Sequence, residues 1–258
     1  NDEWDRDLHG KLGQKPEGPE DQLSAMDGDG IDVMVLYPTA GLHVSALHEK
    51  DYATGITRAY NDWLYHFCKK DPARLKFVAL LAPQDPSAAA EELKRAVKER
   101  GAVGGVLPTY LPQMPDFGDH YYDPIYAAAE NLDVGIGFHT GTSADSLGGQ
   151  RFRKFLSAHT IDHPAEQMMA MIATIIGGVF ERFPRLSIAY LESGIGWVPY
   201  MMDRLDEEVE KRGAVEAPYL TKLPSEYVKS GRIYFGVECE AKTIPDAMKW
   251  GLEDTIFY

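Results

Sequence analysis

The stretch VGIGFHTG, residues 134–141, joins a short apolar run to a polar end. Val134, Ile136 and Phe138 are separated by glycines, His139 follows, and a Gly/Ser-rich stretch typical of a loop comes next. The pattern predicts a buried strand that ends on an imidazole. Taken alone, His139 is either a packed core residue that bonds a loop carbonyl or a functional group at the edge of a cavity, so the rest of the chain must decide.

Apolar runs of this kind alternate with helical patterns along almost the whole chain. Strands are predicted at 30–38, 75–83, 102–109, 134–139, 186–194, 232–238 and 254–258. Helices are predicted near 51–70, 86–100, 123–131 and 164–183, from about 197, and near 243–250. Each strand run is nearly continuously apolar, which is typical of a parallel sheet buried on both faces.

Two folds have this alternation, the doubly wound sheet and the (β/α)8 TIM barrel. The first usually carries a G-x-G-x-x-G turn after its first strand, and YPTAGLH at 37–43 does not match it. We therefore expect one α/β barrel domain over 1–258, without its first strand and without the segment after its eighth. An irregular N-terminal segment at 1–20 and active-site loops at 110–122 and 141–162 complete the expectation.

The composition of the chain excludes several classes of binding partner. The net charge of −14 argues against nucleic acid and against anionic membranes, because both attract clustered Lys and Arg. No apolar run approaches the roughly 18 residues of a membrane span. The two cysteines, Cys68 and Cys239, are too few for a disulfide framework. We expect a cytoplasmic protein that acts on a small molecule.

Active sites of barrels lie at the C-terminal ends of the strands, so those ends hold the candidate residues. They are Thr39, Pro83, Gln84, Thr109, His139, Glu192, Glu238 and Glu240. Imidazole and carboxylate at one barrel mouth suit Zn²⁺ or Mn²⁺. His139 and Glu192 are thus predicted metal ligands, and Glu192 and Glu238 are also candidates for catalysis.

Purely structural roles compete with these functional ones. A carboxylate after IAYL is costly to leave unpaired, so Glu192 is either a ligand or the partner of a cation such as Arg204. Glu238 has the same alternative with Lys242. The stretch HTIDH, residues 159–163, has the i, i+4 spacing of a helical metal site. Pro164 nevertheless predicts that the helix begins after His163, which would then line the mouth from a loop.

Two longer stretches carry a family resemblance. YYDPIYAAAENLDVGIGFHTG (121–141) and GGVFERFPRLSIAYLESGIGWVPYMMDRLDE (177–207) resemble the amidohydrolase-related branch of the metal-dependent hydrolases. That group includes aminocarboxymuconate-semialdehyde decarboxylase and similar aromatic-acid decarboxylases. The resemblance covers about residues 21–258 and implies a (β/α)8 barrel with one divalent metal ion at its mouth.

The resemblance also indicates which residues of this sequence correspond to the site residues of the family. The family's metal-binding histidine on the fifth strand corresponds to His139, and its sixth-strand histidine, a ligand or acid/base, is replaced here by Glu192. The strand-1 H-x-H or E-x-H pair and the final Asp have no counterpart in this sequence. In the decarboxylases the sixth-strand histidine helps protonate a ring carbon, which a glutamate does only if burial keeps it protonated. Glu192 is therefore expected to act as a ligand or a base.

These observations leave two hypotheses. The first is a hydrolase or decarboxylase that uses one Zn or Mn ion on a small cyclic or aromatic acid, ester, lactone or amide, with His163 among its catalytic residues. The aromatic residues of the 110–122 loop, Tyr110, Phe117, Tyr121 and Tyr122, suit such a substrate or simply pack the loop. The second is a metal-free barrel in which Glu192 and Glu238 act as an acid/base pair, or a non-catalytic barrel that binds a small molecule. A homodimer is compatible with either.

Overall fold

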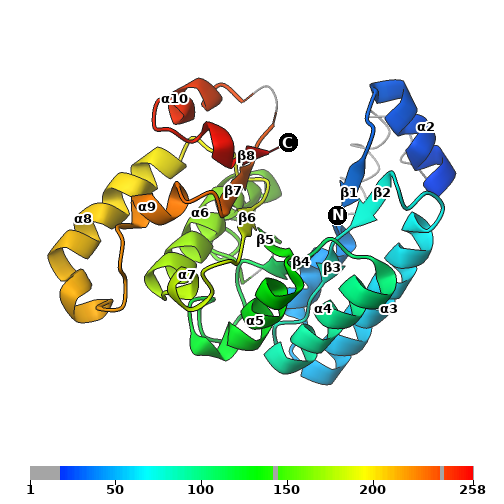
Figure 1. The fold of residues 1–258 in the computed structure, drawn as a ribbon, viewed down its shortest axis with the longest axis horizontal. Coiled ribbons are helices and arrows are strands. Elements are labelled where there is room, and N and C mark those ends of the chain that lie inside the picture. The colour runs from blue at the N-terminus through cyan, green and yellow to red at the C-terminus, as the bar shows by residue number, and fades with distance from the viewer. Residues whose placement is uncertain (1–17, 142–144, 239–240, 258) are drawn as a thin grey trace.

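The structure is a computed structural model that describes residues 18–141, 145–238 and 241–257. Strands and helices alternate along the chain (Figure 1). The strands are β1 (Met34–Leu36), β2 (Leu75–Phe77), β3 (Ala79–Leu80), β4 (Gly104–Pro108), β5 (Gly135–His139), β6 (Ile188–Tyr190), β7 (Ile233–Gly236) and β8 (Ile256–Phe257). Each predicted strand run contains an observed strand, so the predicted alternation is confirmed.

Helices separate the strands. They are α2 (Pro19–Asp29), α3 (Lys50–Cys68), α4 (Pro86–Arg100), α5 (Asp123–Leu132), α6 (Phe155–Ile176), α7 (Val179–Arg182), α8 (Val198–Glu216), α9 (Pro224–Val228) and α10 (Ile244–Met248), with short 3₁₀ helices η1 (Ala40–Ala46), η2 (His120–Tyr122) and η3 (Glu253–Thr255). α4 follows its sequence signals closely. Asp85 accepts a hydrogen bond from the Ala88 N–H, Pro86 occupies the first turn, and Gly101 ends the helix at a φ of 77°.

All strand pairs are parallel, as the apolar runs predicted. β3 to β8 form one sheet in chain order, and β1 pairs with β2 in another. The sheets meet at Val78, whose N–H donates to the Leu36 carbonyl at 3.2 Å. At this junction Asn61 of α3 bonds both backbone groups of Leu80, at 2.8 Å and 3.0 Å. The strands thus follow one another as in a TIM barrel.

The barrel is open between its first and last observed strands. Within the described ranges no ladder joins β1 to β8, and the two strands stand apart in Figure 1. Beside this opening Val33 is 53% exposed and Val35 is 42% exposed. A closed barrel needs one further strand between β1 and β8.

The outer faces of the central strands carry an aromatic ladder. The rings of Phe138, Tyr190 and Phe235 stack across β5, β6 and β7, with centroids 5.9 Å and 5.7 Å apart. Tyr190 also shares a 2.6 Å hydrogen bond with Thr174 of α6. All three rings are fully buried, so α6 is packed firmly against the strands that end at the barrel mouth.

The inner faces of β4 to β7 carry small residues, and a cavity of about 910 Å³ remains inside the barrel. Gly104, Gly137, Ala189 and Gly236 are among the residues that line it. Side chains in a strand alternate between its two faces, so His139 lies on the same inner face as Gly137. The sequence pattern therefore directs the imidazole toward the cavity.

Several predicted boundaries change. α6 begins at Phe155, so residues 155–162 of the predicted 141–162 loop are helical. α2 begins at Pro19, inside the segment predicted as irregular, and α9 was not predicted. Residues 1–17 and 142–144 of the predicted segments, together with Cys239 and Glu240, lie outside the described residues. In the part of the chain described, no helix is long and apolar enough to cross a membrane.

Candidate metal centre

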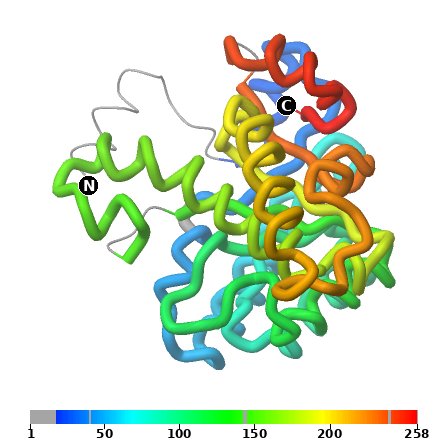
Figure 2. The backbone as a smooth tube through the Cα atoms, turned by 90° about the vertical axis from the view of Figure 1, so that its left-hand side faces the viewer, coloured from blue at the N-terminus to red at the C-terminus, as the bar shows by residue number. Residues whose placement is uncertain are grey.

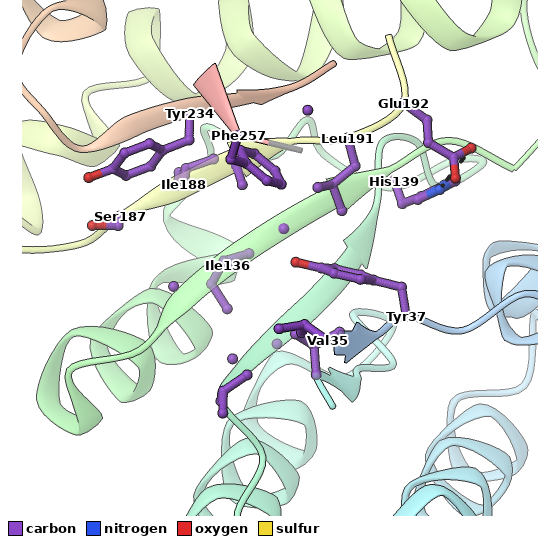
Figure 3. Close-up of a pocket in the computed structure, with 18 of the residues that line it drawn as sticks. Val35, Tyr37, Ile136, His139, Ser187, Ile188, Leu191, Glu192, Tyr234 and Phe257 are labelled. Atoms are coloured by element: carbon purple, nitrogen blue, oxygen red, sulfur yellow. Dashed lines mark ion pairs between the residues drawn. The ribbon is translucent and has the colours of Figure 1, made fainter. Parts of the chain in front are cut away.

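Three predicted site residues meet at the barrel mouth. Nε2 of His139 lies 3.3 Å from Oε2 of Glu192, and Nε2 of His163 lies 3.6 Å from the same oxygen. Figure 3 shows Glu192 and His139 turned toward one another at one end of the cavity. One donor atom from each of the three side chains falls within 4.8 Å of the others. The three residues thus form a compact group of two nitrogens and one oxygen.

His163 reaches this group from a helix, not from a loop, so the predicted helix start after His163 is wrong. α6 runs through Pro164, which has no N–H to donate to the carbonyl of Thr160. Thr160 is exposed, which leaves that carbonyl to solvent rather than to the core. The N-terminal half of α6 extends beyond the body of the molecule (Figure 2), and the helix continues unbroken across the proline.

Because α6 continues, the two histidines of HTIDH share a face. The rings of His159 and His163 lie with centroids 4.2 Å apart. His159 is exposed, while the side chain of His163 is only 12% exposed. Partial burial and the nearby His163 lower the pKa of His159, so His159 stands beside the group as a neutral imidazole at neutral pH.

Glu192 follows β6 in an unusual backbone conformation. Its φ is +55°, in the left-handed region that non-glycine residues rarely occupy. Such a conformation costs free energy and persists where the surroundings fix it. The alternative ion pair with Arg204 is wrong, because Arg204 pairs with Glu207 at 3.1 Å and with Glu208. Glu192 is bound instead to the two histidines, which lower the pKa of its carboxyl, His139 most strongly.

The hydrogen bonds of the imidazoles leave nitrogen atoms facing the carboxylate. Nδ1 of His139 lies 2.9 Å from the carbonyl of Thr140, which can only accept, so this nitrogen carries a proton. Nε2 therefore meets Glu192 either as the second N–H of an imidazolium or as a lone pair directed at a cation. A backbone carbonyl on the far nitrogen is the usual support of a metal-binding histidine.

The group fits a divalent cation chemically. Two imidazoles and one carboxylate are donors that Zn²⁺ and Mn²⁺ accept, and three protein ligands leave coordination positions open. Nδ1 of His163 is buried and has no hydrogen-bond partner among the described residues. The carboxylate of Glu192 and one nitrogen from each of the two imidazoles offer a cation one negative charge and two nitrogen donors.

The remaining candidates lie outside the group. Glu238 lines the cavity after β7, but it is exposed and does not belong to the three-residue group. Thr109 is buried and lies 3.3 Å from the hydroxyl of Thr140. Gln84 donates to the carbonyls of Val44 and Leu47, both at 2.8 Å, which makes it a structural residue of the neighbouring loop.

The aromatic residues of the 110–122 loop divide into two pairs. Phe117 and Tyr122 are 2% and 0% exposed and pack with ring centroids 4.6 Å apart, so they belong to the core. Tyr110 and Tyr121 are partly exposed, and the Tyr121 hydroxyl donates to the Gln84 carbonyl at 2.9 Å. Packing of the loop, rather than contact with a substrate, thus accounts for the buried pair.

Two residues beside the group were not predicted. Tyr37, after β1, lines the cavity below His139 in Figure 3, and burial raises the pKa of its phenol. Gln167, one helical turn after His163, is fully buried. The i, i+4 spacing from a candidate ligand was a signal for Gln167, but the misplaced helix start concealed its relation to β5. No sequence signal distinguished Tyr37.

Comparison with known proteins shows the family of this chain and its similarity to several decarboxylases. Residues 7–257 match the model of the family described as amidohydrolase. A gamma-resorcylate decarboxylase from Rhizobium sp. (strain MTP-10005) is 32% identical over 193 residues, which are 72% of this chain and 58% of that protein. A 2-amino-3-carboxymuconate-6-semialdehyde decarboxylase from Dictyostelium discoideum is 23% identical over 81% of this chain and 57% of its own length. The chain thus spans less than two thirds of these relatives.

Solved structures agree in fold. A 2,6-dihydroxybenzoate decarboxylase complexed with 2,6-dihydroxybenzoate superposes with a TM-score of 0.75 at 27% identity, over 92% of this chain and 74% of that one. A dihydroxybenzoic acid decarboxylase from Polaromonas sp. JS666, with bound manganese and 2-nitroresorcinol, gives a TM-score of 0.76 at 24% identity, over 97% and 76% of the two chains. The predicted fold class, a TIM barrel, is confirmed.

Proposed function

This chain belongs to the amidohydrolase family, and from that premise we propose that it decarboxylates a small aromatic acid with the help of one divalent metal ion, zinc or manganese. The observation that carries the proposal is the convergence of His139, His163 and Glu192 at the end of an apolar cavity. The relatives named as decarboxylases of hydroxylated benzoic acids support the choice of reaction.

His139, His163 and Glu192 are the residues that would hold the ion. When bound, a divalent ion supplies positive charge that polarises an oxygen of the substrate. The protein fixes the donors from three separate elements: the end of β5, the middle of α6 and the turn after β6. Glu192 stays ionised because its carboxyl pKa is lowered by the two histidines, so it contributes negative charge to the centre.

The cavity supports an aromatic substrate. Apolar residues such as Ile136 and Leu191 line it, and it continues into the opening of the barrel beside Val33 and Val35. Tyr37 offers a phenol that stays protonated because burial raises its pKa, and a protonated phenol can donate to a substrate oxygen. An acid carried on a flat ring fits both features, with the ring against the apolar wall and the carboxylate toward the histidines.

Hydrolysis of an ester, lactone or amide is the second candidate, and Glu192 favours it. Loss of CO₂ leaves a ring carbon that must take up a proton, and a carboxyl with a lowered pKa is a poor proton donor. The same carboxylate is ionised and therefore available to accept a proton from water, but its lowered pKa makes it a weak base. For decarboxylation the proton must therefore come from another group or from the solvent.

The metal-free alternative that paired Glu192 with Glu238 has less support. Glu192 is bound to two imidazoles, whereas Glu238 is an exposed residue outside that group. The roles of His163, Glu192 and Glu238 in catalysis stay predictions, as do a homodimer, the lack of nucleic-acid or membrane partners, and a cytoplasmic location.

An activity screen with defined metals tests the proposal. The protein is stripped with a chelator, reloaded with Zn²⁺ or Mn²⁺, and incubated separately with hydroxybenzoic acids and with aryl esters, lactones and amides. We expect metal-dependent CO₂ release from one or more of the acids and none with a His163→Ala variant. Metal-dependent hydrolysis without CO₂ release would select the second candidate, and equal activity with and without metal would contradict both.

A further inference from the structure

Gln167 joins the strands that carry two of the three metal-centre residues. Its side-chain amide, Nε2, donates to the carbonyl of Phe138 at 2.8 Å and to the carbonyl of Leu191 at 2.9 Å. Phe138 directly precedes His139, and Leu191 directly precedes Glu192. Gln167 itself lies one turn after His163 on α6. One fully buried side chain thus contacts the backbone next to two candidate ligands and shares a helix with the third.

The direction of the amide is fixed by its partners. Backbone carbonyls only accept hydrogen bonds, so the atom that faces both of them must be the NH₂ group. The opposite end, Oε1, is buried and has no partner among the described residues. An unpaired buried acceptor costs free energy, and this cost offsets part of what the two hydrogen bonds contribute to stability. The two hydrogen bonds therefore fix the orientation of the amide between the strands.

The backbone conformation of Glu192 indicates what the two hydrogen bonds of Gln167 do. The Leu191 N–H also donates to the Phe138 carbonyl at 3.1 Å, so β5 and β6 are joined at the level just below the ligands. The chain then turns sharply into the left-handed conformation of Glu192. Gln167 holds the Leu191 carbonyl at the start of that turn, and thereby fixes the direction in which the carboxylate leaves the strand.

We propose that Gln167 is a positioning residue that sets the spacing of His139, His163 and Glu192 for metal binding. This inference rests on the metal centre proposed above and adds a residue to it. Gln167 does not touch the ion. It ties the helix of one ligand to the backbone of the other two, so that all three donors keep one relative placement.

The test compares Gln167→Met, which keeps the length of the side chain and removes both donors, with Tyr190→Phe. Tyr190→Phe is a matched control because it removes a buried hydrogen bond between the same helix and the same strand, the 2.6 Å contact with Thr174. Three quantities are measured on each full-length protein: the dissociation constant for Zn²⁺, the visible absorption spectrum of the Co²⁺-loaded form, and the urea midpoint of the metal-free form.

We expect Gln167→Met to weaken Zn²⁺ binding by about tenfold or more, the size of effect that outer partners of metal ligands have, and to alter the Co²⁺ spectrum. Tyr190→Phe should lower the urea midpoint and leave the Zn²⁺ dissociation constant and the Co²⁺ spectrum as in the wild type. If the methionine variant does not fold, Gln167→Asn takes its place. This change keeps the amide, but the shorter side chain moves the NH₂ group away from the two carbonyls.

Wild-type Zn²⁺ affinity and Co²⁺ spectrum in a folded Gln167 variant, with only a lower urea midpoint, would overturn the positioning role and leave the metal centre intact. A wild-type protein that binds neither Zn²⁺, Mn²⁺ nor Co²⁺ would overturn the proposed metal centre, and the role of Gln167 with it. The two failures are therefore distinguishable.

Discussion

The rings of His139 and His163 stand edge to face, with centroids 6.0 Å apart and planes at 82°. One histidine ends a strand and the other lies in the middle of a helix, so their spacing depends on how α6 packs on the sheet. Both Nε2 atoms approach one carboxylate oxygen of Glu192. The relationship makes the site a property of the tertiary fold, and changes at any of the three elements should alter it.

Removing the charge of Glu192 should weaken metal binding, whereas removing the charge of Glu238 should not. Glu192→Gln keeps the size of the side chain and loses the negative charge that stabilises a cation. We expect the dissociation constant for Zn²⁺ to rise by at least about tenfold, the effect that even outer partners of metal ligands have. Glu238→Gln is the control, because Glu238 is exposed and lies outside the group. Equal affinity of the two variants in a calorimetric titration would count against Glu192 as a ligand.

Metal should stabilise the folded protein only when the centre is intact. A ligand that binds the native state alone adds about 2.7 kcal/mol to the free energy of unfolding at one hundred times its dissociation constant. We expect a gain of this size for the wild type in urea titrations with Zn²⁺ or Mn²⁺, and its loss on addition of a chelator. His163→Ala should show no gain. A similar gain in that variant would place the metal elsewhere.

Glu166 should make stability depend on pH. Burial raises the pKa of this carboxyl, which accepts a hydrogen bond from the Leu147 N–H at 3.0 Å. A raised folded-state pKa means that the contribution to stability is fully present below the unfolded value, about 4.3, and is lost as the pH rises through the folded value.

Glu166→Gln keeps an acceptor for Leu147 and cannot ionise. The stability of the variant relative to the wild type should therefore increase between pH 4 and pH 7. Urea midpoints of both proteins measured across this range test the sign. A relative stability that stays constant, or that decreases with rising pH, would contradict burial as the dominant influence on Glu166.

Filling the cavity at Gly137 should weaken substrate binding. A Cβ at this position would lie 2.9 Å from Cδ1 of Leu191, which must move, and 3.4 Å from Cε1 of Tyr37, a van der Waals contact. We expect Gly137→Ala to raise several-fold the dissociation constant for the aromatic acid identified in the activity screen, because Leu191 and Tyr37 line the cavity. Fluorescence titration provides the measurement.

Gly55→Ala is the matched control for Gly137→Ala. Gly55 lies within α3, and a Cβ there has no neighbouring atom within 4 Å. We expect this change to stabilise the protein by about 0.5–1 kcal/mol, because alanine loses less conformational entropy in a helix than glycine. It should leave binding of the aromatic acid unchanged, and equal loss of binding in both variants would show that the cavity is not the site.

The strand pattern of the sequence was enough to predict a parallel α/β fold and the position of His139, and the absence of a G-x-G-x-x-G turn favoured the barrel over the doubly wound sheet. Buried parallel strands require apolar residues at nearly every position, so VGIGFH and IAYLE stand out from their surroundings. The same reasoning located Glu192, since a carboxylate directly after such a run needs a partner. Local composition carries this information because the requirement acts on each strand separately.

The place of His163 could not be predicted in the same way. Pro164 is a start signal for helices in most sequences, but here it lies inside α6, where the extended N-terminal half leaves the affected carbonyl near solvent. The hydrogen bonds of Gln167 to Phe138 and Leu191 likewise depend on how the helix packs across two strands. Such contacts between distant segments leave no periodic pattern in the chain.

Elemental analysis of the purified full-length protein tests the central claim most directly. The wild type is compared with His139→Ala and with His120→Ala, whose ring is exposed and paired with Asp123 at 2.7 Å away from the centre. We predict about one equivalent of Zn or Mn per chain in the wild type and in His120→Ala, and almost none in His139→Ala. No metal in the wild type after growth in Zn- and Mn-supplemented medium, or full retention in His139→Ala, would contradict a metal centre built on His139, His163 and Glu192.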